Sequence, residues 1–224
     1  MADRSVAVLA AATLLALPLL SACGAGAEEP TGTVSGVTVH DEDGMNGAVL
    51  TTPYELPDGT LTDSRGEAFG LADNLDAPLT LVFFGYTHCP DICQAVMADV
   101  SSAISRLDAG EAEQVEMWFV TTDPARDDPE TLRGYLDRFN PDFEGLTGPL
   151  DDIVAVADGV KVAVEKGEKL PSGGYEVNHG TPILGVRPDG SVPILWTEGT
   201  SAASLAEDIH TILTSGVPGV DEEN

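Results

Sequence analysis

Basic side chains are scarce in this sequence. Ten lysine and arginine residues stand against 38 aspartate and glutamate residues among 224, and the formal net charge at pH 7 is −28. A surface of this charge repels phosphate backbones and anionic lipid headgroups, which argues strongly against a nucleic-acid-binding function. The acidity is typical of a solvated surface, with unspecific attraction of cations as a secondary effect. No internal repeat is visible, and the length suits one domain of ordinary size plus tails.

Cysteine is also rare, with three residues: Cys23, Cys89 and Cys93. The first ends an N-terminal segment in which Arg4 precedes an apolar stretch over residues 6–20. Small residues before Cys23 resemble a bacterial lipobox, which implies cleavage before Cys23 and lipid attachment to its sulfur. The alternative is an uncleaved membrane anchor, because the run is just long enough to span a bilayer. Both interpretations place the folded part outside the cytoplasm.

Composition divides the rest of the chain. The region from Gly24 to about Asn46 is rich in small residues, acidic residues and glycine, without a sustained apolar period. This composition is typical of a tether. The last residues are expected to be disordered. We therefore expect a lipoprotein signal peptide over 1–22, a flexible acidic tether over 23–47, a folded domain over 48–215 and a disordered tail over 216–224.

The most informative stretch is Leu81-Val-Phe-Phe-Gly-Tyr-Thr-His-Cys-Pro-Asp-Ile-Cys93. Its four large apolar residues predict a strand buried on both faces. Apolar residues at helical spacing follow it: Ile92, Val96, Val100, Ile104 and Leu107. Cys89 and Cys93 thus stand where a central strand leads into a helix, and residues four apart can share a helix face. The positive end of the helix dipole is expected to lower the pKa of at least one thiol.

Two thiols held side by side can form a disulfide or bind a soft metal ion. A purely structural disulfide is the simpler alternative. However, a disulfide within one helical turn closes a very small loop, so it would constrain the unfolded chain little. In an oxidising compartment the pair is either a disulfide or kept reduced for a purpose.

Further elements follow the cysteine helix. We expect a β-hairpin over 61–69, a buried strand over 115–120, a helix over 128–139 with Asp128 as N-cap and Pro129 at its first position, and a helix over 150–160. A loop over 166–174, a hairpin over 181–196 and a final helix capped by Ser201 complete the domain. This order predicts an α/β layered fold, and the cysteine pair after a central strand makes it thioredoxin-like, with an N-terminal β-hairpin extension.

Three segments carry a more specific resemblance: Phe84-Gly-Tyr-Thr-His-Cys-Pro-Asp-Ile-Cys93, Thr122-Asp-Pro-Ala-Arg-Asp127 and Asn178-His179. They resemble the Sco/SenC family of membrane-tethered, extracytoplasmic copper proteins with a thioredoxin fold that serve cytochrome c oxidase assembly. The resemblance covers about residues 48–214 and implies copper ligation by Cys89, Cys93 and His179. This chain departs from the family pattern at Gln94, where the family has proline, and at Asn178, where it has aspartate.

The residue chemistry agrees with copper. Two thiolates suit Cu(I), and imidazole accepts Cu(I) or Cu(II), whereas a structural zinc site would need four ligands. For His179 the alternative is a loop histidine bonded to water. Asp91 is expected to be an N-cap near the thiols, and the resemblance places Asp123 near the site.

The expected function is that of a copper-binding chaperone on the extracytoplasmic face of the cell membrane. It would be lipid-anchored and would deliver copper to an oxidase subunit that carries a copper site. The alternative is a thiol–disulfide oxidoreductase in which Cys89 and Cys93 reduce the cysteines of the same target or of another envelope protein. A peroxidase-like activity is a third alternative, since an exposed thiolate also reacts with peroxide.

Overall fold

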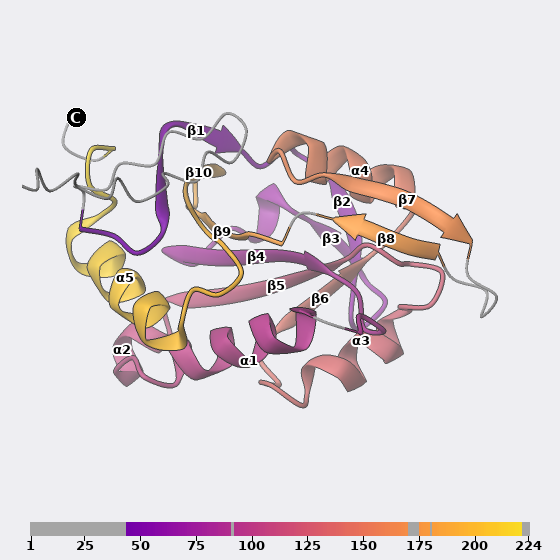
Figure 1. Cartoon of the computed structure of the whole chain (residues 1–224), viewed down its shortest axis with the longest axis horizontal. Helices are drawn as coiled ribbons and strands as arrows, with labels where there is room; N and C mark the ends of the chain where they lie inside the picture. Colours follow the sequence, from indigo (N-terminus) through magenta and orange to yellow (C-terminus); the bar gives the residue numbers. More distant parts are fainter. Residues whose placement is uncertain (1–43, 91, 170–174, 180, 221–224) are drawn as a thin grey trace, which may run out of the picture. The chain divides into compact units, whose positions relative to one another are not determined.

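The computed structural model of the chain describes residues 44–90, 92–169, 175–179 and 181–220, with side chains described outside 165–180. Most strands belong to one eight-stranded mixed sheet (Figure 1). Its spatial order is β1 (Ala48–Glu55), β10 (Ser191–Trp196), β9 (Ile183–Val186), β4 (Leu79–Gly85), β5 (Val115–Thr121), β6 (Glu144–Thr147), β2 (Thr60–Asp63) and β3 (Ala68–Gly70). The neighbours β4, β5 and β6 run parallel, and the other pairs are antiparallel.

The remaining strands, β7 (Val164–Lys169) and β8 (Tyr175–His179), form a separate antiparallel pair. The helices are α1 (Ile92–Ile104), α2 (Ala109–Ala112), α3 (Pro129–Leu136), α4 (Leu150–Gly159) and α5 (Ala202–Ser215), with a short 3₁₀ turn η1 at Ala72–Asn74. Figure 1 shows α1, α3 and α5 on one side of the sheet and α4 on the other. The sheet is thus covered on both faces, as parallel strands require.

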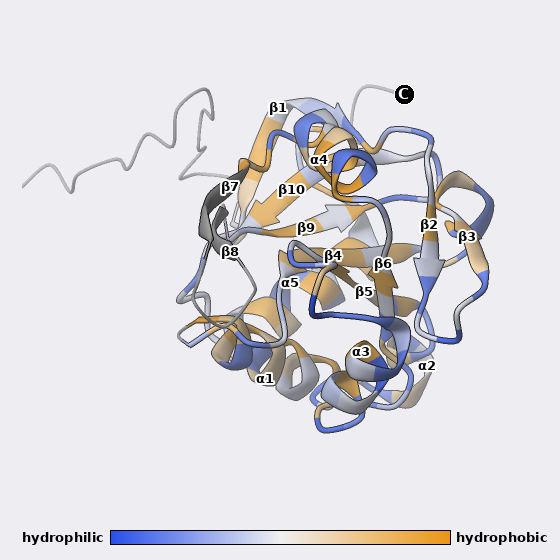
Figure 2. Cartoon of the chain, turned by 90° about the vertical axis from the view of Figure 1, so that its right-hand side faces the viewer, coloured by the Kyte–Doolittle hydropathy of each residue, from blue (hydrophilic) through white to orange (hydrophobic). Residues whose placement is uncertain are grey.

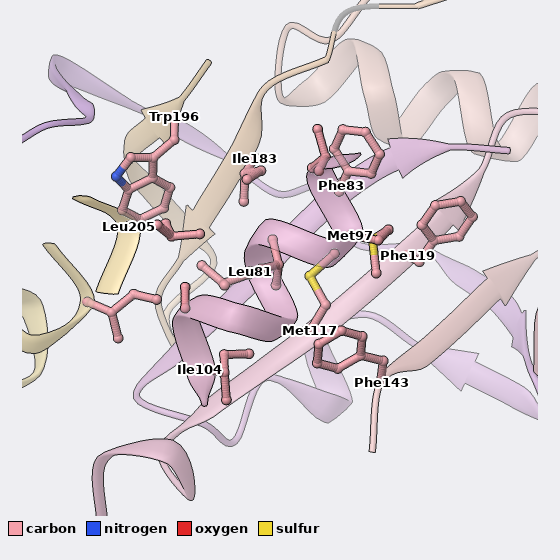
Figure 3. Close-up of a cluster of buried hydrophobic side chains, with 14 of the residues drawn as sticks. Leu81, Phe83, Met97, Ile104, Met117, Phe119, Phe143, Ile183, Trp196 and Leu205 are labelled. Carbon is pink, nitrogen blue, oxygen red and sulfur yellow. The ribbon is translucent and has the colours of Figure 1, made fainter. Parts of the chain in front are cut away.

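Strand β4 is central because its alternate side chains reach both cores. Leu81 and Phe83 pack into the core that α1, α3 and α5 cover, whereas Val82 and Phe84 pack into the core under α4. Figure 3 shows Leu81 and Phe83 in the same cluster of buried side chains as Met97 of α1. Figure 2 shows hydrophobic colouring on strands such as β4 and β10. All seven residues of β4 are buried, which confirms the predicted two-faced strand.

Helix starts follow the local sequence. Asp128 accepts a hydrogen bond from the backbone N–H of Thr131 at 2.8 Å, and Pro129 occupies the first turn of α3, as predicted. Ser201 caps α5 through the N–H of Ser204 at 3.1 Å. The predicted strands over 115–120 and in both hairpins are likewise confirmed.

Several elements differ from the expectation. The strands β1 and β6 and the short helix α2 were not predicted. The expected loop over 166–174 is wrong in its first part, because residues 166–169 belong to β7 and pair with β8. His179 consequently ends a strand rather than lying in a loop.

The ends of the fold lie beyond the expected domain limits. Asp208 of α5 accepts hydrogen bonds from the backbone N–H of Gly47 at 2.8 Å and from Trp196 Nε1 at 2.7 Å, so the chain is fixed before Ala48. Val217, in the segment expected to be a disordered tail, is buried in the core. The expected signal peptide, most of the tether and residues 221–224 lie outside the described residues. Within the described part, no helix is both long and apolar enough to span a membrane.

Candidate metal centre

The cysteine pair lies where β4 leads into α1. The strand ends at Gly85, and the helix begins at Ile92, so Cys93 is in its first turn. The backbone N–H of Cys89 donates to the carbonyl of Tyr86 at 3.2 Å, which closes a tight turn between the strand and the helix. Both cysteines are free thiols, and their side chains are hydrogen-bonded to each other. The structure therefore brings Cys89 and Cys93 together as predicted.

The pair is almost closed to solvent: Cys89 is 7% exposed and Cys93 is fully buried. Burial raises the pKa of the Cys93 thiol, and the hydrogen bond with Cys89 raises it further. Cys93 is therefore not a thiol whose pKa the helix dipole lowers, because removal from water outweighs the amides of the first turn. A metal that binds Cys93 at neutral pH must displace its proton.

Tyr86 links the pair to the loop after β5. Its hydroxyl is hydrogen-bonded to the Cys89 side chain, and burial together with the charges of the two cysteines raises its pKa to about 12. The guanidinium of Arg126 lies 6.0 Å from the centre of the Tyr86 ring. Arg126 in turn donates from Nε to the buried carboxylate of Asp123. Asp123 thus lies behind Arg126 and contacts the cysteine loop through it.

A second carboxylate from the same loop, Asp127, was missed as a site residue. It is fully buried and accepts hydrogen bonds from the Thr87 backbone N–H at 2.9 Å, the Thr87 hydroxyl at 2.6 Å and the Thr121 hydroxyl at 2.7 Å. Two of these three donors belong to the segment that precedes Cys89. Asp127 therefore fixes the cysteine loop against the end of β5. A carboxylate shortly after a buried strand, within a motif already noted, was the available signal.

His88 stands between Thr87 and Cys89 and is largely exposed. Its Nδ1 lies 2.9 Å from the Thr87 hydroxyl oxygen and 3.7 Å from the Asp127 carboxylate. The imidazole is thus held by the same residues that fix the loop. Its position beside the cysteines makes it part of the site's surface.

The other predicted site residues are only partly described. His179 is the last residue of β8, opposite Val164, and its side chain lies outside the described part. Asp91 and Cys23 also lie outside the described residues. Among the described side chains, no group of three or more His, Cys, Asp or Glu residues is arranged to hold a metal ion. A complete three-ligand site would therefore need a side chain beyond that part, such as His179.

The donor chemistry fits a soft metal. Two adjacent, reduced thiols in an apolar surrounding match Cu(I), which prefers thiolate ligands and low coordination numbers. The two buried carboxylates of the loop after β5 are already occupied, Asp123 by Arg126 and Asp127 by Thr87 and Thr121. Hard, oxygen-binding ions such as Ca²⁺ and Mg²⁺ would find no suitable ligand set among the described residues here.

Comparison with known proteins finds chains that are similar in sequence and in fold. Protein SCO2, mitochondrial, of Saccharomyces cerevisiae is 34% identical over 164 residues, which is 73% of this chain and 54% of the yeast protein. The chain thus spans about half the length of this relative. The copper-bound structure of Bradyrhizobium japonicum ScoI is 31% identical, with a TM-score of 0.60 over 70% of this chain and 96% of that chain.

The structure of yeast Sco1 with copper bound is 26% identical, with a TM-score of 0.67 over 75% of this chain and 92% of that chain. These likenesses confirm the predicted α/β, thioredoxin-like fold. The model of the SCO1/SenC family matches residues 50–214, which covers both the cysteine loop and the loop that carries Asp123 and Asp127. The chain belongs to the SCO1/SenC family.

Proposed function

We propose that this protein binds copper and delivers it to a copper-carrying subunit of cytochrome c oxidase. The observation that carries the proposal is the pair of free, adjacent, buried thiols at the end of β4. The pair occurs in a chain whose family is linked to oxidase assembly and whose relatives have been solved with copper bound.

The proposed ligands are Cys89, Cys93 and His179. Two thiolates hold Cu(I), and an imidazole nitrogen added to them also allows Cu(II). Three ligands leave the metal coordinatively open, which suits cargo that has to be handed on. Asp91 would cap α1 beside the pair, and Asp123 would act on it through Arg126.

The proposed location is the extracytoplasmic face of the cell membrane. Lipid attachment to Cys23 would anchor the chain there, and the acidic segment that follows would act as the tether. The formal charge of −28 argues against holding the domain on anionic lipid by electrostatics, so the anchor has to supply the attachment.

Thiol–disulfide exchange is the alternative function, which an experiment must distinguish from copper delivery. It would use the same pair, with Cys89 attacking because Cys93 is fully buried. Exchange makes no demand on His179, whereas a three-ligand copper site does. The copper-bound relatives favour delivery.

The test is an anaerobic copper(I) titration of the purified, reduced chain, followed by transfer to the copper-free copper-site domain of an oxidase subunit. We expect one copper per chain, none in Cys89→Ser, and transfer that is impaired in His179→Ala. His210→Ala is the matched control, because His210 is an exposed histidine on α5 that bonds Glu111 instead. Wild-type transfer by His179→Ala would remove His179 from the proposed ligand set, whereas a wild-type chain that takes up no copper but reduces a disulfide of the same oxidase domain would support thiol exchange instead.

A further inference from the structure

The segment before the cysteine pair fixes the tautomer of the His88 imidazole. The Thr87 hydroxyl donates its single proton to Asp127 Oδ1 at 2.6 Å. Its oxygen can therefore only accept from His88 Nδ1, which lies 2.9 Å away. His88 must then carry its proton on Nδ1, which leaves the lone pair of Nε2 unprotonated in the neutral ring.

This arrangement is that of a metal-binding histidine. Such residues almost always donate their second ring N–H to a carboxylate or its equivalent, which fixes the tautomer and the ring orientation. Here the carboxylate is Asp127, fully buried and fixed by Thr121 from the adjacent strand, and Thr87 transmits its effect. The chain Asp127–Thr87–His88 thus orients a bare Nε2 on an anchored loop.

The side chains of His88, Cys89 and Cys93 differ in solvent exposure. The His88 side chain is 55% exposed, Cys89 is 7% exposed and Cys93 is fully buried. A metal ion that arrives from a partner protein therefore meets His88 before it can reach both thiols. His88 is also the immediate chain neighbour of Cys89, so the two side chains belong to the same loop.

We propose that His88 is a transfer ligand, which binds copper(I) through Nε2 while the ion passes between a partner and the Cys89–Cys93 pair. The inference rests on the proposed copper function and adds a residue to it. On entry, a bond from copper to His88 Nε2 forms as a bond to the donor's ligand breaks. Bonds to the two sulfurs then form, each thiol releases its proton to water, and the bond to Nε2 breaks. Copper remains Cu(I) throughout, so no electron donor or acceptor is needed.

The consequence is kinetic. A transfer ligand accelerates entry and exit by the same factor, so its removal leaves the equilibrium affinity almost unchanged. A permanent ligand would instead change occupancy and affinity. Rates and affinities measured on the same variants separate these two roles.

The experiment follows copper(I) transfer by stopped-flow absorbance, from a chromogenic copper(I) chelator to the purified, reduced chain and back to an excess of chelator. We expect His88→Ala to slow both directions about tenfold, the lower end of the effect of losing an oriented metal contact, with affinity changed less than about twofold. Thr87→Val keeps the imidazole but removes the relay, and we expect an intermediate slowing. His210→Ala, an exposed histidine away from the loop, should transfer at the wild-type rate.

Three results decide the matter. Equal rates for His88→Ala and His210→Ala, with copper still bound through the cysteines, would overturn the transfer role alone. A large loss of affinity in His88→Ala would overturn it too, because His88 would then be a permanent ligand. If the wild-type chain takes up no copper, or Cys89→Ser takes up as much, the proposed function itself fails.

Discussion

Asp127 fixes the cysteine loop, so replacing it with asparagine should measurably destabilise the domain. The carboxylate is fully buried and accepts three hydrogen bonds, two of them on Oδ2, from Thr87 N–H and the Thr121 hydroxyl. Asparagine keeps one oxygen. The favourable orientation places it toward those two donors and turns the amide NH₂ toward the Thr87 hydroxyl.

The cost follows from this geometry. Two charge-assisted hydrogen bonds become neutral ones, each weaker by about 1 kcal/mol, and the Thr87 hydroxyl must reverse its role. We therefore expect Asp127→Asn to lower the free energy of unfolding by about 2–3 kcal/mol, against a total of about 5–15 kcal/mol for a domain. Reversal of Thr87 also frees its proton to donate to His88 Nδ1, so the ring is no longer held with its own proton on Nδ1, which should make copper transfer slower.

The next residue provides the control. Asp128 is the N-cap of α3, where asparagine caps as well as aspartate, so Asp128→Asn should cost less than about 0.5 kcal/mol. Urea unfolding of the reduced, metal-free proteins compares the two variants at equal slope. An Asp127→Asn variant as stable as Asp128→Asn would refute the reasoning that the buried carboxylate holds the loop.

Three further predictions concern other groups. Burial opposes ionisation of Asp63, yet hydrogen bonds from Glu67 and Arg65 hold its pKa below the usual value. A carboxylate whose pKa is lower in the folded than in the unfolded chain stabilises the fold above the unfolded-state pKa, and this stability is lost as the pH falls through the folded-state pKa. Asp63→Asn should therefore weaken the loss of unfolding free energy at acidic pH. An unchanged loss would contradict this. Because the pKa of Cys93 is raised, copper(I) loading of the wild-type chain at pH 7.5 should release the Cys93 proton, measured in weak buffer with a pH indicator, and loading without proton release would contradict this. Cys23→Ser should lose the lipid and leave the membrane fraction while keeping its copper stoichiometry, and a loss of copper would show that the residue has another role.

Local patterns were sufficient for much of the fold. The four large apolar residues that precede Gly85 in β4 favoured a strand buried on both faces, and the Asp128-Pro129 start of α3 needs no tertiary partner. Strand β6 was missed because its four residues include Gly145 and gain their stability from pairing with β5 and β2. Strand β7 is rich in lysine and glutamate, which have low strand propensity, and exists through its pairing with β8.

The candidate site, too, could be predicted from the sequence only in part. The spacing of Cys89 and Cys93 after a strand predicted that the thiols would meet. The raised pKa of Cys93 could not be predicted, because it depends on how completely α1 and its neighbours cover the thiol. The Asp127–Thr87–His88 relay joins residues forty positions apart, and only the parallel pairing of β4 with β5 brings their ends together.

The central claim is that Cys89, Cys93 and His179 hold one copper ion. X-ray absorption at the copper edge of the copper(I)-loaded, purified chain tests it most directly, because sulfur and nitrogen neighbours scatter differently. The account predicts two sulfur atoms and one nitrogen atom around copper, with the nitrogen lost in His179→Ala and retained in His88→Ala. A wild-type spectrum without nitrogen, or a nitrogen that disappears only in His88→Ala, would contradict it.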